Sequence, residues 1–431
     1  MSDFLLAQLE QLQAKDAKRR LNMKPVLWTQ LQQAEPDSHI VSFGNSFYLS
    51  HLLERTSLRA CLQSLRESGV SVDSVKSLLV FALTASHGCS DLDEYRGAIG
   101  GSGGSGGSGD RAVSPVSPVS PVSSVSSVSP VSGVSAVSVE PTVSADTCLP
   151  EKWWRNDVAC HLWPDAHLNV GAIRKLFATL GQPEVFVPCM ESYLYDFDEW
   201  HSSEQQLGLE ISLGDKTDRI RALGLIDQAT GLPLFFHLYG RATVNAPFSQ
   251  TLAVLDHFGL HPHMICGSLY MKTCLIKDTR YGKLSQSSEG SMWQSPYSTD
   301  SPEVRKECTS RMKLFGEYTN WLLQNCPVLR ASAKDPLNVI RGKMLILFMA
   351  VTLLMRLQQL LKEQQWKSHL HYSQDPLVAL DSLSKFKLLL FSNGAGVLSA
   401  SSRYVRVLFQ ALSVHCPAYF TSEQGASAVI E

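Results

Sequence analysis

The chain has 431 residues, 44% of them hydrophobic and 18% charged, with a formal net charge of −2. At roughly 150 residues per domain, this predicts two or three domains in a folded protein. Near-neutral charge excludes binding of nucleic acid through a global excess of positive charge, so any contact with DNA would depend on local basic patches. The ten cysteines show no CxxC or paired Cys/His spacing, which argues against a zinc site and is typical of reduced thiols in the cytoplasm.

The N-terminal region, residues 1–98, is predicted to be helical. Apolar residues recur at helical spacing from Phe4 to Leu12 and again from Val41 to Leu83, with a basic segment, Lys15–Arg20, between them. The first helix either packs on a partner with a solvated face outward or contacts phosphates, and its charge pattern favours the former. The chain begins with an early acid and no sustained apolar run, so we expect no secretory signal.

Residues 99–147 differ in composition from the rest of the chain. A Gly-Ser run covers Gly100–Gly109, and Val-Ser-Pro repeats extend from Val113 to about Val143. With few bulky side chains and recurrent proline, the segment cannot bury a core. We therefore expect a disordered linker before a domain at residues 148–431. The Gly-Ser run is either an engineered insertion or a natural low-complexity expansion.

The centre of the chain, residues 191–275, predicts a strand, a long hairpin, a helix and another strand. In order, these are Ser192–Asp196, the hairpin strands Arg219–Ile226 and Pro233–Gly240, the helix Phe248–Phe258 and the strand Met264–Cys266. Two apolar runs around the short turn Asp227–Gly231 are typical of a hairpin. Four apolar residues at helical spacing support the helix.

Helices dominate the expected structure after the polar, loop-like stretch Arg280–Ser301. They cover Glu303–Leu323, ended by Pro327, then the apolar run Met344–Met355, then Asp375–Lys387 and Ser402–Ser413. The apolar run is shorter than the roughly 20 residues that a membrane span needs. We therefore expect no membrane contact and a buried helix, with Leu345, Phe348 and Leu353 packed against the sheet.

This order of elements resembles the ribonuclease-H-like core of DDE transposases from bacterial insertion sequences, in particular the "insertion sequence four" superfamily. The phrases that carry the resemblance are Leu225-Ile226-Asp227, Gly231–Leu234 and Tyr239-Gly240 in the hairpin, and Arg341–Lys343 before the apolar helix. It covers about Asn169 to about Cys416. It implies an α/β protein: a ribonuclease-H-like mixed sheet with flanking helices, beside the helical N-terminal region and the disordered linker.

The resemblance also implies a function in DNA transposition. Such proteins bind double-stranded DNA at the transposon ends, and three carboxylates around two Mg²⁺ ions cleave and transfer its strands. The helical N-terminal region would help to grip the transposon ends. We expect a cytoplasmic protein, and a homodimer is left open.

Only one of the three metal-binding acids has an evident place in this sequence. Asp196 fits the first position, and Asp198, two residues later on the same side of a strand, is its alternative. The second acid should follow the strand that ends near Cys266, but no acid lies between Asp256 and Asp278. Sulfur is a poor ligand for Mg²⁺, so we expect Cys266 to be buried and inert.

The third acid should lie in the helix after residue 302, where Met312 stands in its place and Glu317 follows one turn later. We therefore predict a transposase-family protein that has lost catalysis, with Asp198, Asp278 and Glu317 as weak candidates for the missing acids. Two alternatives remain: an active transposase whose acids are aligned differently, and a scaffold that reuses the fold. Three nearby histidines have the spacing of satisfied polar groups rather than of a zinc site, namely His257, His261 and His263.

The linker hypothesis predicts where a protease should cut. Limited proteolysis should first cleave between Gly100 and Ala145 and leave a stable C-terminal fragment, because a segment without packed contacts is open to the protease. Mass spectrometry of early digests measures the sites. Uniform resistance along the chain would contradict the expectation.

Overall fold

The computed structural model describes the protein over twelve stretches. They are residues 38–84, 149–201, 205–214, 220–241, 244–245, 248–267, 282–287, 290–294, 301–368, 373–392, 394–417 and 419–421. The first amphipathic helix, the linker and Asp278 lie outside them. All described residues belong to one compact unit, formed by Met1–Gly88 and Asp146–Glu431.

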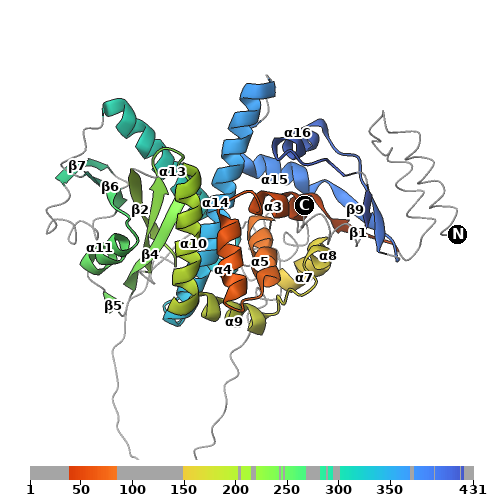
Figure 1. Ribbon diagram of the computed structural model, residues 1–431, viewed down its shortest axis with the longest axis horizontal. Coiled ribbons are helices and arrows are strands. Elements are labelled where there is room, and N and C mark those ends of the chain that lie inside the picture. Colours follow the sequence, from red (N-terminus) through yellow and green to blue (C-terminus); the bar gives the residue numbers. More distant parts are fainter. Residues whose placement is uncertain are drawn as a thin grey trace, which may run out of the picture. The chain divides into compact units, whose positions relative to one another are not determined.

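The described residues form a mixed α/β structure with two sheets (Figure 1). The α-helices are α3 Gly44–Leu53, α4 Leu58–Glu67, α5 Val72–Thr84, α7 Leu149–Arg155, α8 Ala159–Leu162, α9 Val170–Leu180, α10 Pro183–His201, α11 Phe248–His257, α13 Pro302–Asn325, α14 Leu337–Ser368, α15 Pro376–Ser384 and α16 Arg403–Ala411. The strands are β1 His39–Ser42, β2 Gln206–Ser212, β3 Arg221–Asp227, β4 Pro233–Arg241, β5 Val244–Asn245, β6 Pro262–Gly267, β7 Gly282–Ser287, β8 Gly290–Gln294, β9 Lys387–Leu390, β10 Ala395–Leu398 and β11 Tyr419–Thr421.

The larger sheet has the strand order β5-β4-β3-β2-β6-β8-β7. Strands β2, β3 and β4 are antiparallel neighbours, and β6 returns parallel to β2 after α11. The predicted hairpin, helix and following strand are confirmed as β3, β4, α11 and β6. At the hairpin turn, the Asp227 carboxylate accepts hydrogen bonds from the backbone N–H and hydroxyl of Thr230, and Gly231 has a positive φ of 77°. These features are typical of a tight turn.

The predicted first strand is wrong. Residues 192–196 lie in helix α10, and the strand that starts the hairpin core is β2. The aromatic residues suggested a strand, but the buried residues of α10 recur every three to five positions, as on one face of a helix. They are Val185, Cys189, Met190, Tyr193, Leu194 and Phe197. The stretch Arg280–Ser301, expected to be a loop, contains β7 and β8.

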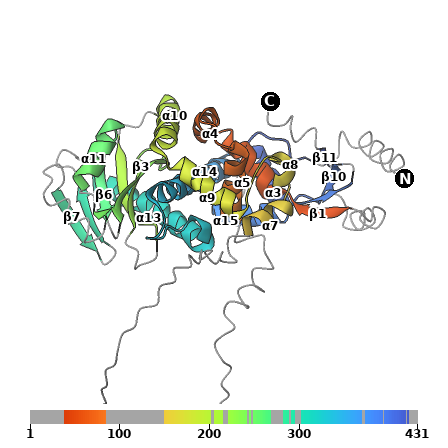
Figure 2. The same ribbon diagram turned by 90° about the horizontal axis from the view of Figure 1, so that it is seen from below.

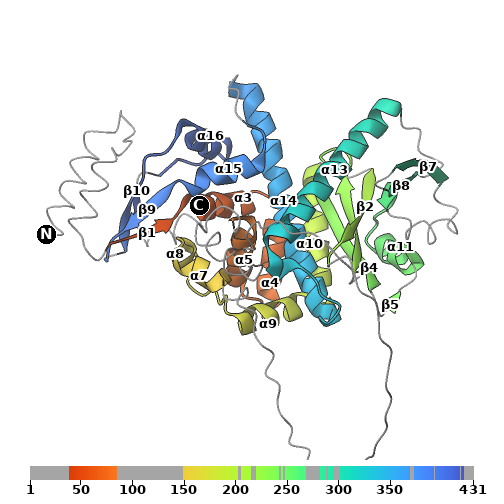
Figure 3. The same ribbon diagram turned by 180° about the vertical axis from the view of Figure 1, so that it is seen from behind.

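Helices cover both faces of this sheet. On one face, the ring of Phe315 from α13 packs against β3 where Gly224 leaves room for it, and Figure 3 shows α13 lying across the strands. On the other face, the Phe235 ring on β4 contacts Phe258, which follows α11, and Phe186 of α10.

Helix α14 is the apolar helix that the sequence predicts, extended to 32 residues. Leu345, Phe348 and Leu353 are all buried, and the Phe348 ring makes an edge contact with Phe236 of β4. Its stretch Leu337–Gln364 is long and apolar enough to cross a membrane by length and composition, but 83% of its most apolar 18 residues are buried inside the fold.

Helices α9 and α14 approach so closely that they require glycine. A Cβ on Gly342 would lie 2.0 Å from the carbonyl oxygen of Phe177, and one on Gly181 would lie 1.7 Å from that of Asn338. Gly342 is the centre of the Arg-Gly-Lys phrase that carries part of the family resemblance. The phrase therefore has a structural reason in this protein, the contact between two helix backbones.

The smaller sheet joins the two ends of the described chain. Strand β1, from the N-terminal region, pairs antiparallel with β9, and the sheet continues through β10 to β11 (Figure 2). The N-terminal helices also contact the rest of the fold: α4 lies along α10, and α5 packs on α14. The N-terminal region and residues 148–431, expected to be separate domains, thus share one compact unit.

A disulfide bond links Cys61 of α4 to Cys189 of α10. Both side chains are fully buried. The expectation that all thiols are reduced is therefore wrong for this pair. The bond spans 128 residues of sequence, and it joins the N-terminal helices to the part of the chain that follows the predicted linker.

Beside the smaller sheet lies a buried carboxyl group. Asp157 accepts hydrogen bonds from the Ser46 hydroxyl and the backbone N–H of Ala159. Burial raises the pKa of Asp157 to about 7, although these bonds and the nearby Lys387 ammonium counteract the shift. Burial also lowers the pKa of Lys387, whose ammonium donates to the Ser42 hydroxyl.

Replacing Phe348 by alanine should reduce the free energy of unfolding by about 3–5 kcal/mol, because the ring fills a space in the core. Urea denaturation measures the loss. Tyr195→Ala is the matched control: this ring is 78% exposed on α10, so its loss should change stability by less than about 0.5 kcal/mol. Equal effects of the two variants would contradict the packing described here.

The buried Asp157 predicts a pH dependence. Its pKa is raised in the folded state, so between about pH 4 and pH 7 the folded protein binds a proton that the unfolded chain releases, and stability falls as pH rises. Asp157→Asn removes this titration. The variant should therefore gain stability relative to the parent from pH 4 to pH 7 and level off above. A difference that stays constant with pH in urea denaturation would refute it.

Candidate functional site

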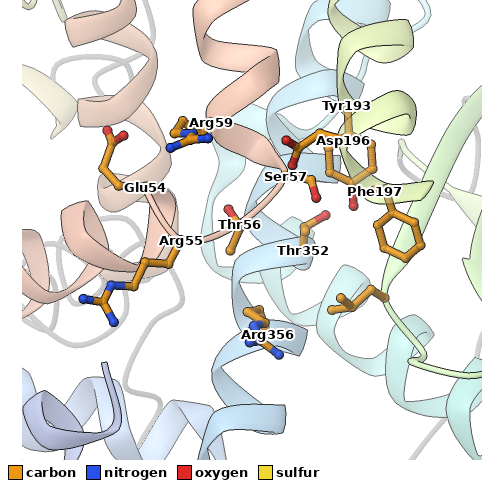
Figure 4. Close-up of a pocket in the computed structure, with 11 residues that line it drawn as sticks. Glu54, Arg55, Thr56, Ser57, Arg59, Tyr193, Asp196, Phe197, Thr352 and Arg356 are labelled. Atoms are coloured by element: carbon orange, nitrogen blue, oxygen red, sulfur yellow. The ribbon is translucent and has the colours of Figure 1, made fainter. Parts of the chain in front are cut away.

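Asp196, the predicted first acid, lines a cavity instead of ending a strand (Figure 4). The cavity has a volume of about 370 Å³ and lies between α4 with its preceding loop, α10 and α14. Its lining residues are Glu54, Arg55, Thr56, Ser57, Arg59, Tyr193, Asp196, Phe197, Leu232, Thr352 and Arg356. Asp196 is half-buried, one turn after Tyr193 on the inner side of α10.

Three arginines make this cavity rich in positive charge. Arg55 and Arg59 are exposed and have no ion pair within the described part of the chain. Arg356 on α14 donates a hydrogen bond of 2.9 Å to the Gln359 side chain and lies 3.6 Å from the Glu363 carboxylate. Glu54 also lines the cavity, but it forms a 2.7 Å ion pair with the buried Lys76.

The wall formed by α10 and α14 is held by buried hydroxyl groups. The Tyr193 hydroxyl donates a 2.6 Å hydrogen bond to the backbone carbonyl of Pro233, at the start of β4. Burial raises the pKa of Tyr193, and the Asp196 carboxylate adds to that shift. The Thr352 hydroxyl donates to the Phe348 carbonyl within α14. These side chains are therefore engaged in structure and are not available as proton donors at neutral pH.

The other predicted acids lie apart from Asp196. Asp198 is exposed two residues further along α10, so on a helix it points to a different side. Glu317 of α13 lines a separate cavity together with Asp375 and Tyr318. Asp278 lies outside the described residues. Within the stretches that the structure describes, no group of three or more His, Cys, Asp or Glu side chains could hold a metal ion.

The strand that begins the hairpin core carries an acid that was not predicted. Glu210 is on β2, and the pairing of Leu209 with Cys266 places it level with Gly267, where the second acid was expected. Its carboxylate accepts a 2.9 Å hydrogen bond from Arg221 and another from the Tyr239 hydroxyl. The alternation of residues along Gln206–Ser212 is the signal that would have identified the strand.

The face of the sheet under α13 is apolar. The side chains of this helix that turn inward include Cys308, Met312 and Phe315, all buried. Gly316 lies against Leu209 of β2, since a Cβ there would come within 3.1 Å of the leucine side chain. Met312 thus occupies a core position. Cys266 on β6 packs against the same core but is only partly buried, so the expectation of a buried Cys266 is wrong.

The histidines near β6 do not assemble a metal site either. The His261 ring lies 3.3 Å from the Asp256 carboxylate, and the His257 ring makes an edge contact with Phe258. The third, His263, lies on β6 with both ring nitrogens buried.

Comparisons with known proteins add no relative. The sequence matches no protein-family model and has no significant match among curated proteins or solved structures.

Proposed function

We propose that this chain is a transposase-derived protein with a ribonuclease-H-like domain that binds double-stranded DNA and lacks strand-transfer chemistry. The observation that carries the proposal is the order β4-β3-β2-β6, in which an antiparallel hairpin follows the first strand and the fourth strand returns parallel beside the first. This agrees with the expected order of strand, hairpin, helix and strand, once β2 replaces the predicted first strand.

The loss of chemistry is supported by what stands where the acids should meet. In the family, the three carboxylates come from the first strand, the fourth strand and a later helix. In this protein, Leu209 of β2 is paired with Cys266 of β6 at that place. Met312 and Phe315 of α13 are buried above the same strands. Two divalent ions a few ångströms apart need several carboxylate oxygens. The described residues therefore do not fit a two-metal Mg²⁺ centre.

Glu210 does not replace the missing acids. Its side chain is only 4% exposed and is already paired with Arg221. Removing this buried carboxylate from the pair to bind a metal would break its 2.9 Å contact with Arg221, which is costly. The alternative of an active transposase would therefore need a different set of acids, with Asp278 as the only earlier candidate outside the described residues.

DNA binding does not depend on the carboxylates, since it is based on contacts between basic side chains and phosphates. With a net charge of −2, the protein needs a local concentration of positive charge. The cavity with Arg55, Arg59 and Arg356 supplies one. The second candidate is a scaffold that reuses the fold without binding DNA. The apolar region beneath α13 is compatible with it, but it leaves the three arginines without a role.

The proposal predicts that the purified protein does not nick supercoiled DNA with Mg²⁺ or Mn²⁺, because the described residues offer no place for two metal ions. A gel-based nicking assay measures this. Asp196→Ala and Glu210→Gln are the control variants. Metal-dependent nicking that either substitution abolishes would refute the loss of chemistry and identify that acid as catalytic.

A complementary variant asks whether the site can be rebuilt. The double variant Cys266→Asp with Met312→Glu places carboxylates on the fourth strand and on α13, where the family resemblance implies them. Replacing Phe315 by Glu instead of Met312 tests the position one turn later on the same buried face of α13. Each variant first needs a check of folding by circular dichroism, because charges enter the core. Metal binding gained by a folded variant would support the alignment with the family.

A further inference from the structure

We propose that the cavity between α4, α10 and α14 binds one phosphodiester group, held by Arg55, Arg59 and Arg356. This inference deepens the proposed function, because it names the place at which a DNA backbone phosphate would be bound. It also stands on its own geometry: three arginines, Arg55 and Arg59 at the start of α4 and Arg356 on α14, line one cavity of about 370 Å³, a size within the usual range of ligand pockets.

The guanidinium groups are available to an anion. Arg55 and Arg59 carry no ion pair among the described residues. The Arg356 guanidinium lies 3.6 Å from the carboxylate of Glu363, which is half-exposed. An exposed ion pair at that distance is weak. Guanidinium groups match phosphate oxygens with paired N–H donors, so an entering phosphate would gain more than it displaces.

The backbone segments that carry the arginines are held in place. The loop before α4 is closed by the hydrogen bond from the Arg55 N–H to the Leu52 carbonyl and by that from the Thr56 hydroxyl to the Leu53 carbonyl. The ion pair of Glu54 with Lys76 anchors the same loop to α5. The Cys61–Cys189 disulfide joins the two helices that form opposite walls, α4 and α10. A binding site whose parts are held in place loses less entropy when a ligand binds.

The remaining charges select a singly charged anion. The negative charge of Glu54 is compensated by Lys76. The three arginines then stand against the two carboxylates of Asp196 and Glu363, so the summed charge is about one positive unit. A phosphodiester carries one negative charge at neutral pH, whereas a phosphomonoester or a triphosphate carries more. The Asp196 carboxylate, which Figure 4 shows on the α10 side, would repel the additional charge of those ligands.

A hydroxyl group of the loop completes the site. Thr56 and Ser57 both line the cavity, but the Thr56 hydroxyl already donates to the Leu53 carbonyl, which leaves the Ser57 hydroxyl for a ligand. The Ser57 side chain makes no capping hydrogen bond to α4, so its hydroxyl can donate to a phosphate oxygen. Hydroxyl and guanidinium donors together are typical contacts to a nucleic-acid backbone, which position the strand but read no sequence.

The test measures the affinity for a 30-base-pair duplex by fluorescence polarisation over a range of salt concentrations. Arg55→Gln and Arg59→Gln should each reduce the affinity about eightfold at 0.1 M salt and lower the salt slope by about one, for any duplex sequence. Asp196→Asn should increase the affinity. Arg155→Gln is the matched control: this exposed arginine on α7 is outside the cavity, paired with Glu151, and should change neither quantity.

A second probe separates this inference from the proposed function. The dinucleotide thymidylyl-thymidine carries one phosphodiester, and its binding is followed by thermal shift. Duplex binding that the cavity variants leave unchanged would overturn the cavity while DNA binding stands. Dinucleotide binding that the variants abolish, in a protein that binds no duplex, would support the cavity and overturn DNA binding. Binding of neither probe would overturn both, and preference for thymidine monophosphate would overturn the selection of a diester.

Discussion

The burial of helix α14 is the constraint on which the rest of the described fold depends. This helix is apolar along most of its length, and a helix that is apolar on all sides must be covered on all sides. Helices α5, α9 and α13, strand β4 and the C-terminal helices α15 and α16 all contact it. The N-terminal helices are therefore part of the coat of α14, which explains why residues on both sides of the predicted linker form one compact unit.

The burial of α14 also accounts for the apolar face of the sheet beneath α13. The Phe348 ring of α14 touches Phe236, and Phe236 in turn touches Phe315 of α13. The region in which metal-binding acids are expected is thus continuous with the core around α14. A carboxylate introduced there would lose its hydration without a partner.

Sequence patterns predicted the elements whose periodicity is strong. The hairpin, α11, β6, α13 and the burial of α14 are all confirmed. The first strand was wrong because Tyr193 and Tyr195 have high strand propensity. The four-residue spacing of the buried Tyr193 and Phe197 indicates a helix instead. Strand β2 was missed although its residues alternate between polar and apolar, because the run is short and follows a polar stretch. Contacts between distant residues, such as Glu210 with Tyr239, could not be predicted from spacing at all.

The candidate site, like the fold, was only partly predictable from the sequence. The sequence led to Asp196, but for a reason that the structure does not support, since the residue lies on a helix and beside arginines instead of acids. Arg59 and Arg356 are almost 300 positions apart, and only the packing of α4 and α14 around α10 brings them to one cavity. A carboxylate among guanidinium groups has the opposite electrostatic role from one among metal-binding acids, because it repels anions instead of attracting cations. In the phosphate site that we propose, the residue that suggested a cation site in the sequence would therefore limit the charge of the bound anion.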